Sequence, residues 1–182
     1  MKIVKILLLS IAVIVAIFAI AFGIYLIVNT QKTAEPFEAV FGEGEARVLF
    51  ATQGSNFKDA LSAEVLSLLE GQSLYLKGID ISQLADVDPD RWDAFVLIHT
   101  TERWKLPKAI EGFLARVDDE KIVQVITSGS GEWVPESWGI DAITSASKDE
   151  EITPVAREIV ERVKEIVRTG HAETTETPPI NE

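Results

Sequence analysis

The sequence predicts an α/β domain built on a parallel sheet of about five strands, preceded by one N-terminal transmembrane helix. Short apolar runs of strand length alternate with helical patterns between residues 46 and 170, and such alternation is typical of βαβ units. Residues 94–100, AFVLIHT, form an almost wholly apolar run, as expected for a central strand covered on both faces. Residues 6–28 carry no charge at all, which sets them apart from the α/β pattern.

The uncharged run of residues 6–28 has the length of a membrane span. As a helix, 23 residues rise about 34 Å, enough to cross a hydrocarbon core of about 30 Å. The run exceeds the apolar region of a cleaved signal peptide, so we expect an uncleaved anchor. Lys2 and Lys5 precede it and only Lys32 follows closely. The positive-inside rule then predicts a cytoplasmic N-terminus, residues 1–5, and an extracytoplasmic domain.

Composition narrows the possible partners. The chain has 17 lysines and arginines against 29 acidic residues; without Lys2 and Lys5, the remainder carries a net charge of −14. Such a domain is poorly suited to nucleic-acid phosphates, so no nucleic acid is expected among its partners. The chain has no cysteine, which excludes disulfides, thiolate metal sites and cysteine nucleophiles.

The segments that flank the α/β pattern read as linkers. Residues 29–45 contain Thr, Glu, Pro and Gly without clear periodicity, and we interpret them as a tether. Their Gly-x-Gly precedes a strand, whereas a dinucleotide fingerprint follows one. Residues 171–182, HAETTETPPINE, are polar and predict a disordered tail. The domain itself is expected at residues 46–170.

The first half of the domain predicts two strands around one helix. Residues 47–51 form a short apolar strand, and residues 58–70 place apolar side chains at helical spacing. Asn56 is expected to cap this helix, with Asp59 completing a capping box, and Gly71 to end it. Residues 73–76 predict the second strand, and residues 79–90 a loop with one helical turn at 82–85.

The second half continues the alternation. After the third strand, 94–100, Pro107 suits the first turn of a helix, followed by a fourth strand at 121–127 and a fifth at 141–145. Residues 153–169 carry an apolar stripe at helical spacing. Thr153 is expected to cap this last helix, Pro154 to open it and Gly170 to end it.

Ligands of parallel α/β sheets bind beyond the carboxyl ends of the strands. The loops there are TQGSNF after the first strand, HTTERWK after the third and TSGSGEWVP after the fourth. They lack the carboxylates of a phosphoryl-accepting receiver, the Walker loop of an NTPase and the Gly-x-Ser-x-Gly turn of a hydrolase. His99 is the one histidine of the predicted domain. It supports neither a catalytic triad nor a metal site, and we interpret it as a strand-end residue.

The loop TQGSNF resembles the phosphate loop of flavodoxins, Thr/Ser-x-Thr-Gly-Asn-Thr, and the order of elements over residues 46–169 is similar to that family. The resemblance implies a doubly wound, flavodoxin-like sheet with strand order 2-1-3-4-5 and a noncovalently bound FMN. Its phosphate would lie on the first loop, and its ring against aromatic side chains of the two later loops. The cofactor-binding residues so implied are Thr52, Gln53, Gly54, Ser55, Asn56, Phe57, Thr100, Thr101, Trp104, Ser128, Gly129, Ser130 and Trp133.

Several departures from the family leave an alternative open. Phe57 replaces a hydroxyl of the phosphate loop, and His99 and Thr100 replace the Gly-x-Pro after the third strand. The connection of residues 128–140 is near the minimum for a crossover, so Trp133 and Trp138 would serve equally well as a cover for the sheet. The first loop would equally serve as a plain strand-to-helix turn.

A second, short resemblance concerns residues 141–147, DAITSAS. They are similar to the covalent flavin-attachment motif of periplasmic FMN-binding domains, Asp-x-x-Ser/Thr-Gly-Ala-Thr, with Ser147 at the acceptor position and Ser145 in place of the glycine. The alternative is a strand-end turn specific to this fold.

Two classes of function follow. The first is a membrane-anchored, FMN-binding electron carrier whose partner is a membrane redox protein. The second is a cofactor-free, flavodoxin-like module that binds a protein or another partner at the cell envelope.

Overall fold

The computed structural model describes residues 2–29, 32–101, 105–132 and 141–175, and within them all side chains except those of 2–4, 6–8, 25–29 and 171–175. The chain divides into two compact units, Met1–Lys32 and Thr33–Glu182. Each unit is described by itself.

The first unit is the helix α1, Lys2–Asn29. Its large apolar side chains between Leu9 and Ile24 are exposed; Phe18, for example, has 72% of its surface accessible. In the part of the chain whose side chains are described, no helix combines the length and hydropathy of a membrane span.

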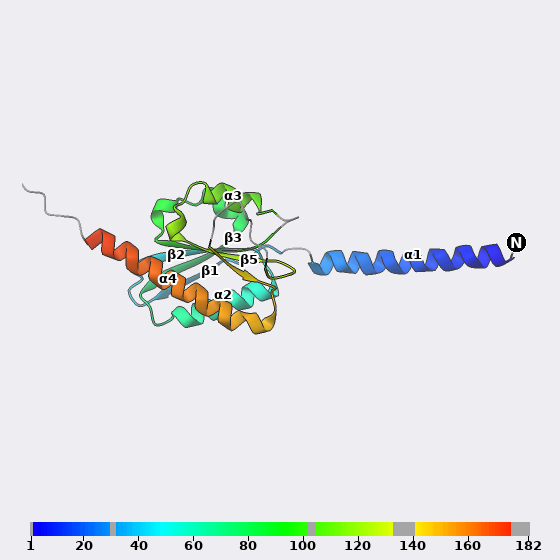
Figure 1. The fold of residues 1–182 in the computed structure, drawn as a ribbon, viewed down its shortest axis with the longest axis horizontal. Helices are drawn as coiled ribbons and strands as arrows, with labels where there is room; N and C mark the ends of the chain where they lie inside the picture. Colours follow the sequence, from blue (N-terminus) through cyan, green and yellow to red (C-terminus); the bar gives the residue numbers. More distant parts are fainter. Residues whose placement is uncertain (1, 30–31, 102–104, 133–140, 176–182) are drawn as a thin grey trace, which may run out of the picture. The chain divides into compact units, whose positions relative to one another are not determined.

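The second unit is built on one sheet formed by six strands of the described residues (Figure 1). They are β1 (Phe37–Phe41), β2 (Ala46–Thr52), β3 (Leu74–Asp80), β4 (Ala94–Thr100), β5 (Ile122–Thr127) and β6 (Ala142–Ser145). Their spatial order is β1-β3-β2-β4-β5-β6. The strands β2 to β6 are parallel, and only β1 runs antiparallel, against β3. The predicted strands 1 to 5 correspond to β2 to β6, and their predicted order 2-1-3-4-5 is the observed order β3-β2-β4-β5-β6. The antiparallel strand β1 was not predicted.

Helices cover both faces of the sheet. The helices α2 (Asn56–Leu69) and α4 (Ile152–Thr175) pack together on one face, and α3 (Lys108–Leu114) lies on the other (Figure 1). Short 3-10 helices occupy the connections: η1 (Ile81–Asp86), η2 (Pro89–Arg91), η3 (Asp119–Lys121) and η4 (Asp149–Glu151). The helical turn predicted at 82–85 is part of η1.

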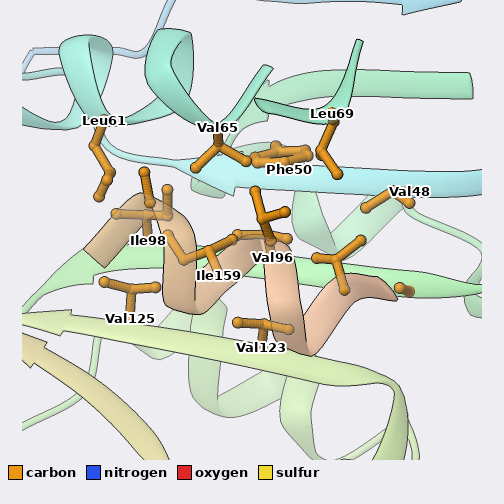
Figure 2. Close-up of a cluster of buried hydrophobic side chains, with 14 of the residues drawn as sticks. Val48, Phe50, Leu61, Val65, Leu69, Val96, Ile98, Val123, Val125 and Ile159 are labelled. Atoms are coloured by element: carbon orange, nitrogen blue, oxygen red, sulfur yellow. The ribbon is translucent and has the colours of Figure 1, made fainter. Parts of the chain in front are cut away.

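The core beneath α2 and α4 follows from the period of two in the strands. Alternate residues of β2, such as Val48 and Phe50, point to this face and meet Leu61 and Val65 of α2 (Figure 2). Each of these side chains is fully buried, which contributes about 1.5–3 kcal/mol per residue. The intervening residues form a second core under α3, where the Phe95 and Phe113 rings meet edge to face. A sheet buried on both faces holds its strand ends in fixed positions.

The strand β1 corrects the prediction of a tether at residues 29–45. Its residues FEAVF alternate between partly buried and exposed, the pattern of a strand with one covered face. Phe37 lies opposite Gly78 of β3 and packs against Phe50, with ring centroids 5.7 Å apart. A Cβ on Gly78 would fall 2.1 Å from the Phe37 ring. The ring therefore occupies the space that a side chain at position 78 would take, and this docks β1.

Three predicted helix boundaries were wrong. Ser55 caps α2 in place of Asn56. The last helix begins at Ile152, so Thr153 lies inside it. Its backbone also continues past Gly170 to Thr175, into the predicted tail, while residues 176–182 lie outside the described chain. A glycine inside a helix costs only about 1 kcal/mol relative to alanine, and neighbouring helical residues offset that cost.

Candidate functional site

The carboxyl ends of β2, β4 and β5 are neighbours in the sheet. They bring together three of the predicted loops: residues 52–57 after β2, residues 100–101 after β4 and residues 128–130 after β5. The predicted ring-stacking residues Trp104 and Trp133, like Trp138, lie outside the described residues. The described part of the site therefore consists of the loop residues that would bind the phosphate and of the starts of the two later loops.

The side chains at the start of the first loop, Thr52 and Gln53, form hydrogen bonds within the protein. The Thr52 hydroxyl donates to the Gln53 carbonyl oxygen at 3.1 Å. The side-chain oxygen of Gln53 accepts from the Thr100 amide at 2.7 Å, which ties the end of β2 to the end of β4. Both side chains are buried, with 4% and 6% of their surface exposed. These two predicted ligand residues thus support the loop from beneath.

The helix α2 begins directly after this loop. The Ser55 hydroxyl accepts from the Lys58 amide at 3.2 Å, which makes Ser55 the N-cap. Phe57 is buried in the core under α2 and α4, so its ring serves the core and not the site. Asn56 is exposed. No acceptor is found among the described residues for the amides of Asn56 and Phe57, which lie in the first turn, where amides lack helical partners.

Lys58 is a site residue that the sequence analysis missed. Its side chain is 3% exposed, and its ammonium nitrogen donates to the Thr100 hydroxyl at 2.8 Å. Thr100 and Thr127 share a 2.7 Å hydrogen bond, and Thr127 also donates to the His99 carbonyl oxygen at 3.2 Å. A chain of polar groups therefore crosses the ends of β4 and β5 and terminates in a buried cation.

Burial controls the charge of this cation. It lowers the pKa of Lys58 to about 8, although the nearby Asp59 carboxylate acts in the opposite direction. The position of Lys58 in the sequence, three residues after the helix cap, was the available signal. A lysine there faces the positive end of the helix dipole, where cations are unfavourable.

His99 is the next-to-last residue of β4, and its side chain is buried. Its Nε2 lies 2.9 Å from the Gln124 side-chain nitrogen, and no part of the residue is exposed. Burial lowers the pKa of His99 to about 4. The imidazole is therefore neutral at physiological pH and stays inside the fold.

The loop after β5 folds on itself. The Gly131 amide donates to the carbonyl oxygen and to the hydroxyl of Ser128, at 3.2 and 3.1 Å. Gly129 and Ser130 are exposed at the tip. Gly131 has a φ of 73°, and a Cβ there would come 2.8 Å from the Ala146 nitrogen. A glycine is required at position 131 because the two loops touch.

The DAITSAS segment forms the strand β6 and the turn after it, which is held by Glu151, a second residue that the sequence analysis missed. The Glu151 carboxylate accepts from the Ser145 hydroxyl at 2.5 Å and from the Ala146 amide at 2.8 Å. The hydrogen bond from Ser145 lowers the pKa of Glu151 below its usual value. Ser147 is exposed and has a φ of 61°, a conformation that few residues other than glycine adopt. The segment is thus a structured strand-end turn with an outward-facing serine.

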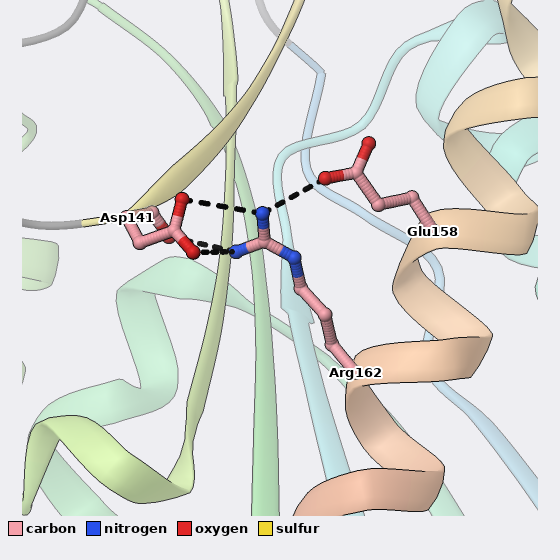
Figure 3. Close-up of polar contacts among 3 residues, drawn as sticks. All are labelled: Asp141, Glu158 and Arg162. Carbon is pink, nitrogen blue, oxygen red and sulfur yellow. Dashed lines mark hydrogen bonds and ion pairs between the residues drawn. The ribbon is translucent and has the colours of Figure 1, made fainter.

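An arginine clamp fixes the other end of β6 to α4 (Figure 3). The Arg162 guanidinium donates to the Asp141 carbonyl oxygen at 2.9 Å and pairs with the Asp141 carboxylate at 3.1 Å. It also pairs with Glu158 one helical turn away, at 2.8 Å. These contacts tie α4 to the residue that precedes the edge strand β6.

Comparison with known proteins adds two distant structural neighbours. No family model and no curated protein matches the chain. A flavodoxin from the domain Archaea is 12% identical with a TM-score of 0.46, covering 66% of this chain and 98% of its own. An oxidoreductase from Corynebacterium diphtheriae is 14% identical with a TM-score of 0.39, covering 69% of this chain and 97% of its own.

Proposed function

We propose that the domain binds a phosphate-bearing flavin, FMN, at the carboxyl edge of the sheet and carries electrons at the membrane to which α1 anchors it. The observation that carries the proposal is the buried ammonium of Lys58 at the first turn of α2. Its position beside the loop of residues 52–57 suits the phosphate of the cofactor.

The Lys58 ammonium forms no ion pair in the described protein, although the Asp59 carboxylate lies near enough to raise its pKa. Its one described hydrogen bond goes to a neutral hydroxyl, and the described ion pairs all involve Arg162 and Arg168. Burying a charge without a partner is costly. A phosphate dianion at this position would offset that cost, and it would also accept hydrogen bonds from the amides of Asn56 and Phe57.

When bound, the flavin ring supplies the capacity to take up and release electrons. The chain's own residues hold the phosphate and shape the edge on which the ring lies. Thr101, Ser128, Gly129 and Ser130 stand on the loops that flank this edge. Trp104 and Trp133 are the proposed stacking partners of the ring.

The anchor places this chemistry at a membrane. The uncharged residues 6–28, preceded by Lys2 and Lys5, support a single-pass anchor with the domain on the extracytoplasmic side. A carrier held there would exchange electrons with a redox protein of the same membrane.

A second candidate is a cofactor-free module that binds a partner at the cell envelope. The observation that favours it is the internal use of the predicted phosphate ligands. The Thr52 hydroxyl donates to the Gln53 carbonyl oxygen, and the side-chain oxygens of Gln53 and Ser55 accept from backbone amides, so these side chains already serve the loop and its link to β4.

A fluorescence titration separates the two candidates. FMN is titrated with the full chain in detergent, and quenching of flavin fluorescence reports binding. Lys58→Met should weaken FMN binding about tenfold or more, because a charge-assisted hydrogen bond is lost. Asn56→Ala tests the remaining free polar side chain of the loop. Lys121→Met, the same substitution at the opposite edge of the sheet, should leave the affinity unchanged.

Riboflavin, which lacks the phosphate, is the matched ligand. It should bind the wild-type chain and the Lys58→Met variant equally. Absence of quenching by the wild-type chain would exclude the electron carrier and leave the cofactor-free module. Equal FMN affinity in wild type and Lys58→Met would show that the loop is only a turn.

The same samples test covalent attachment. Flavin that stays with the chain after denaturation and precipitation, and is lost in Ser147→Ala, would place the bond at Ser147. Flavin that is released by denaturation would establish the noncovalent mode.

A further inference from the structure

A cavity of about 300 Å³ lies on the face of the sheet that α3 and η1 cover, and no residue of the loop 52–57 lines it. Its walls include Arg47 at the start of β2 and Tyr75 at the start of β3. The lining also includes Trp92, Lys77 and Arg91. An adjoining cavity of about 310 Å³ shares Arg47 and Tyr75. Arg47 thus borders both spaces.

Arg47 is held by two aromatic rings. Its guanidinium carbon lies 5.2 Å from the centroid of the Tyr75 ring and 5.2 Å from that of Trp92. The two rings lie next to each other, with centroids 6.0 Å apart and planes 26° from parallel. Such contacts stabilise the cation and fix the plane of the guanidinium. A planar donor held in this way is prepared for bidentate recognition of an oxyanion.

The guanidinium has no oxyanion partner among the described residues. Its Nε is buried and makes no hydrogen bond, and the described ion pairs do not include Arg47. The nearby Asp93 carboxylate accepts from the main-chain amide of Arg47 at 2.7 Å, so it is directed at the backbone. The charge of Arg47 is therefore not neutralised by an ion pair within the described structure.

The lining of the cavity carries more basic than acidic side chains, although the chain as a whole is acidic. The protein as a whole has a net charge of −12, yet Arg47, Lys77 and Arg91 line this one space. The carboxylates that share the lining are Asp86 and Asp88. Asp88 accepts from the Asp90 amide at 3.2 Å to cap η2. No ion pair joins either carboxylate to these cations in the described structure.

We propose that this cavity is a binding site for a small oxyanion, a phosphate or carboxylate group, held by the Arg47 guanidinium with Lys77 and Arg91 as supporting charges. The site is independent of the proposed flavin site. Lys58 follows the carboxyl end of β2, whereas Arg47 lies near its amino end, so each site can be removed without the other.

Calorimetric titration of the full chain in detergent tests the proposal. Inorganic phosphate, sulfate and acetate are used as probes at constant ionic strength, with chloride as the background anion. Phosphate is expected to bind more tightly than acetate, because it carries more negative charge and more acceptor oxygens for the Arg47 guanidinium. Acetate binding as tight as that of phosphate would assign the oxyanion to the carboxylate class.

Substitutions locate the binding. Arg47→Met should weaken phosphate binding about tenfold or more, whereas Arg157→Met, the same change at an exposed position of α4, should have no effect. Lys77→Met should weaken binding less while leaving the contact of Arg47 with both rings in place. Lys58→Met should leave this affinity unchanged, which separates the cavity from the flavin site.

A site-specific signal completes the test. In proton–nitrogen spectra, the Nε–H resonance of Arg47 should shift during the phosphate titration, because an oxyanion then lies against the guanidinium to which this group belongs. An unshifted resonance, or equal phosphate affinity in the wild type and in folded Arg47→Met and Lys77→Met variants, would overturn the proposal.

Discussion

At the scale of single residues, Lys58 decides how the candidate site is interpreted. Its side chain is buried, and its ammonium donates to the Thr100 hydroxyl at the end of β4. The charged form is destabilised by burial, which lowers the pKa to about 8. A group kept at this cost is more readily explained by a bound anion than by stability of the fold.

The cost of Lys58 predicts a pH-dependent stability. The folded chain has the lower pKa, so between about pH 8 and pH 10.5 the unfolded chain binds more protons. The penalty, up to about 3 kcal/mol, is therefore fully present below about pH 8 and disappears as the pH rises through this window. Lys58→Met, which keeps the stem, should be more stable than wild type at pH 7 and equally stable near pH 10.5.

Urea denaturation in phosphate-free buffer across this pH range measures the difference. Lys121→Met is the control and should track the wild type at every pH. A difference between Lys58→Met and wild type that does not change with pH would show that the ammonium is not held in a desolvated state.

At the scale of secondary structure, β1 depends on an empty position in its neighbour. Phe37 lies over Gly78 of β3, and an added Cβ would clash with its ring. The same ring contacts Phe50 in the core. The missing side chain at Gly78 therefore leaves the space that the Phe37 ring fills. This contact docks β1 as an edge strand, although its segment has the composition of a linker.

Gly78→Ala should consequently displace Phe37 and release β1. We expect a loss of about 1–3 kcal/mol in the free energy of unfolding, the usual cost of overpacking. Faster hydrogen exchange at the β1 amides should accompany it. Gly112→Ala is the matched control, because a Cβ there meets no atom within 4 Å, and it should stabilise α3 by about 0.5–1 kcal/mol. Unchanged exchange in Gly78→Ala would contradict the docking of Phe37 over Gly78.

At the scale of the whole molecule, the two proposed binding sites lie at opposite ends of the strand β2. The carboxyl edge carries Lys58 and the loops of the proposed flavin site. The amino end of β2 carries Arg47 and the proposed oxyanion cavity. The two proposed sites share the strand β2 but no side chain, so we expect an anion at one of them to leave the other accessible.

The proposed anchor is tested on the whole chain. In fractionated bacterial cells, the full chain should stay with the membrane after a high-salt wash, whereas a chain lacking residues 1–32 should be soluble. In intact spheroplasts, added protease should digest the domain of the full chain. A full chain released by salt would contradict the anchor, and a protected domain would reverse the orientation.

The sequence by itself determined the alternation of strands and helices and the parallel direction of five strands. It also placed the loops after β2, β4 and β5 at one edge. These features depend on local periodicity and on the connection lengths between neighbouring elements. They accordingly survive errors such as the misplaced helix cap at Asn56 and the predicted end of the last helix at Gly170.

Only the tertiary structure decided which side chains are free to act. It turned Gln53 toward the Thr100 amide, buried Lys58 beside Thr100, docked Phe37 over Gly78 and laid Arg47 against Tyr75 and Trp92. In each case the partners are dozens of residues apart in the chain. Their meeting depends on sheet order and packing, which local patterns do not encode. The polarity of a residue can be read from the sequence, but its hydrogen-bond partner is fixed by the fold around it.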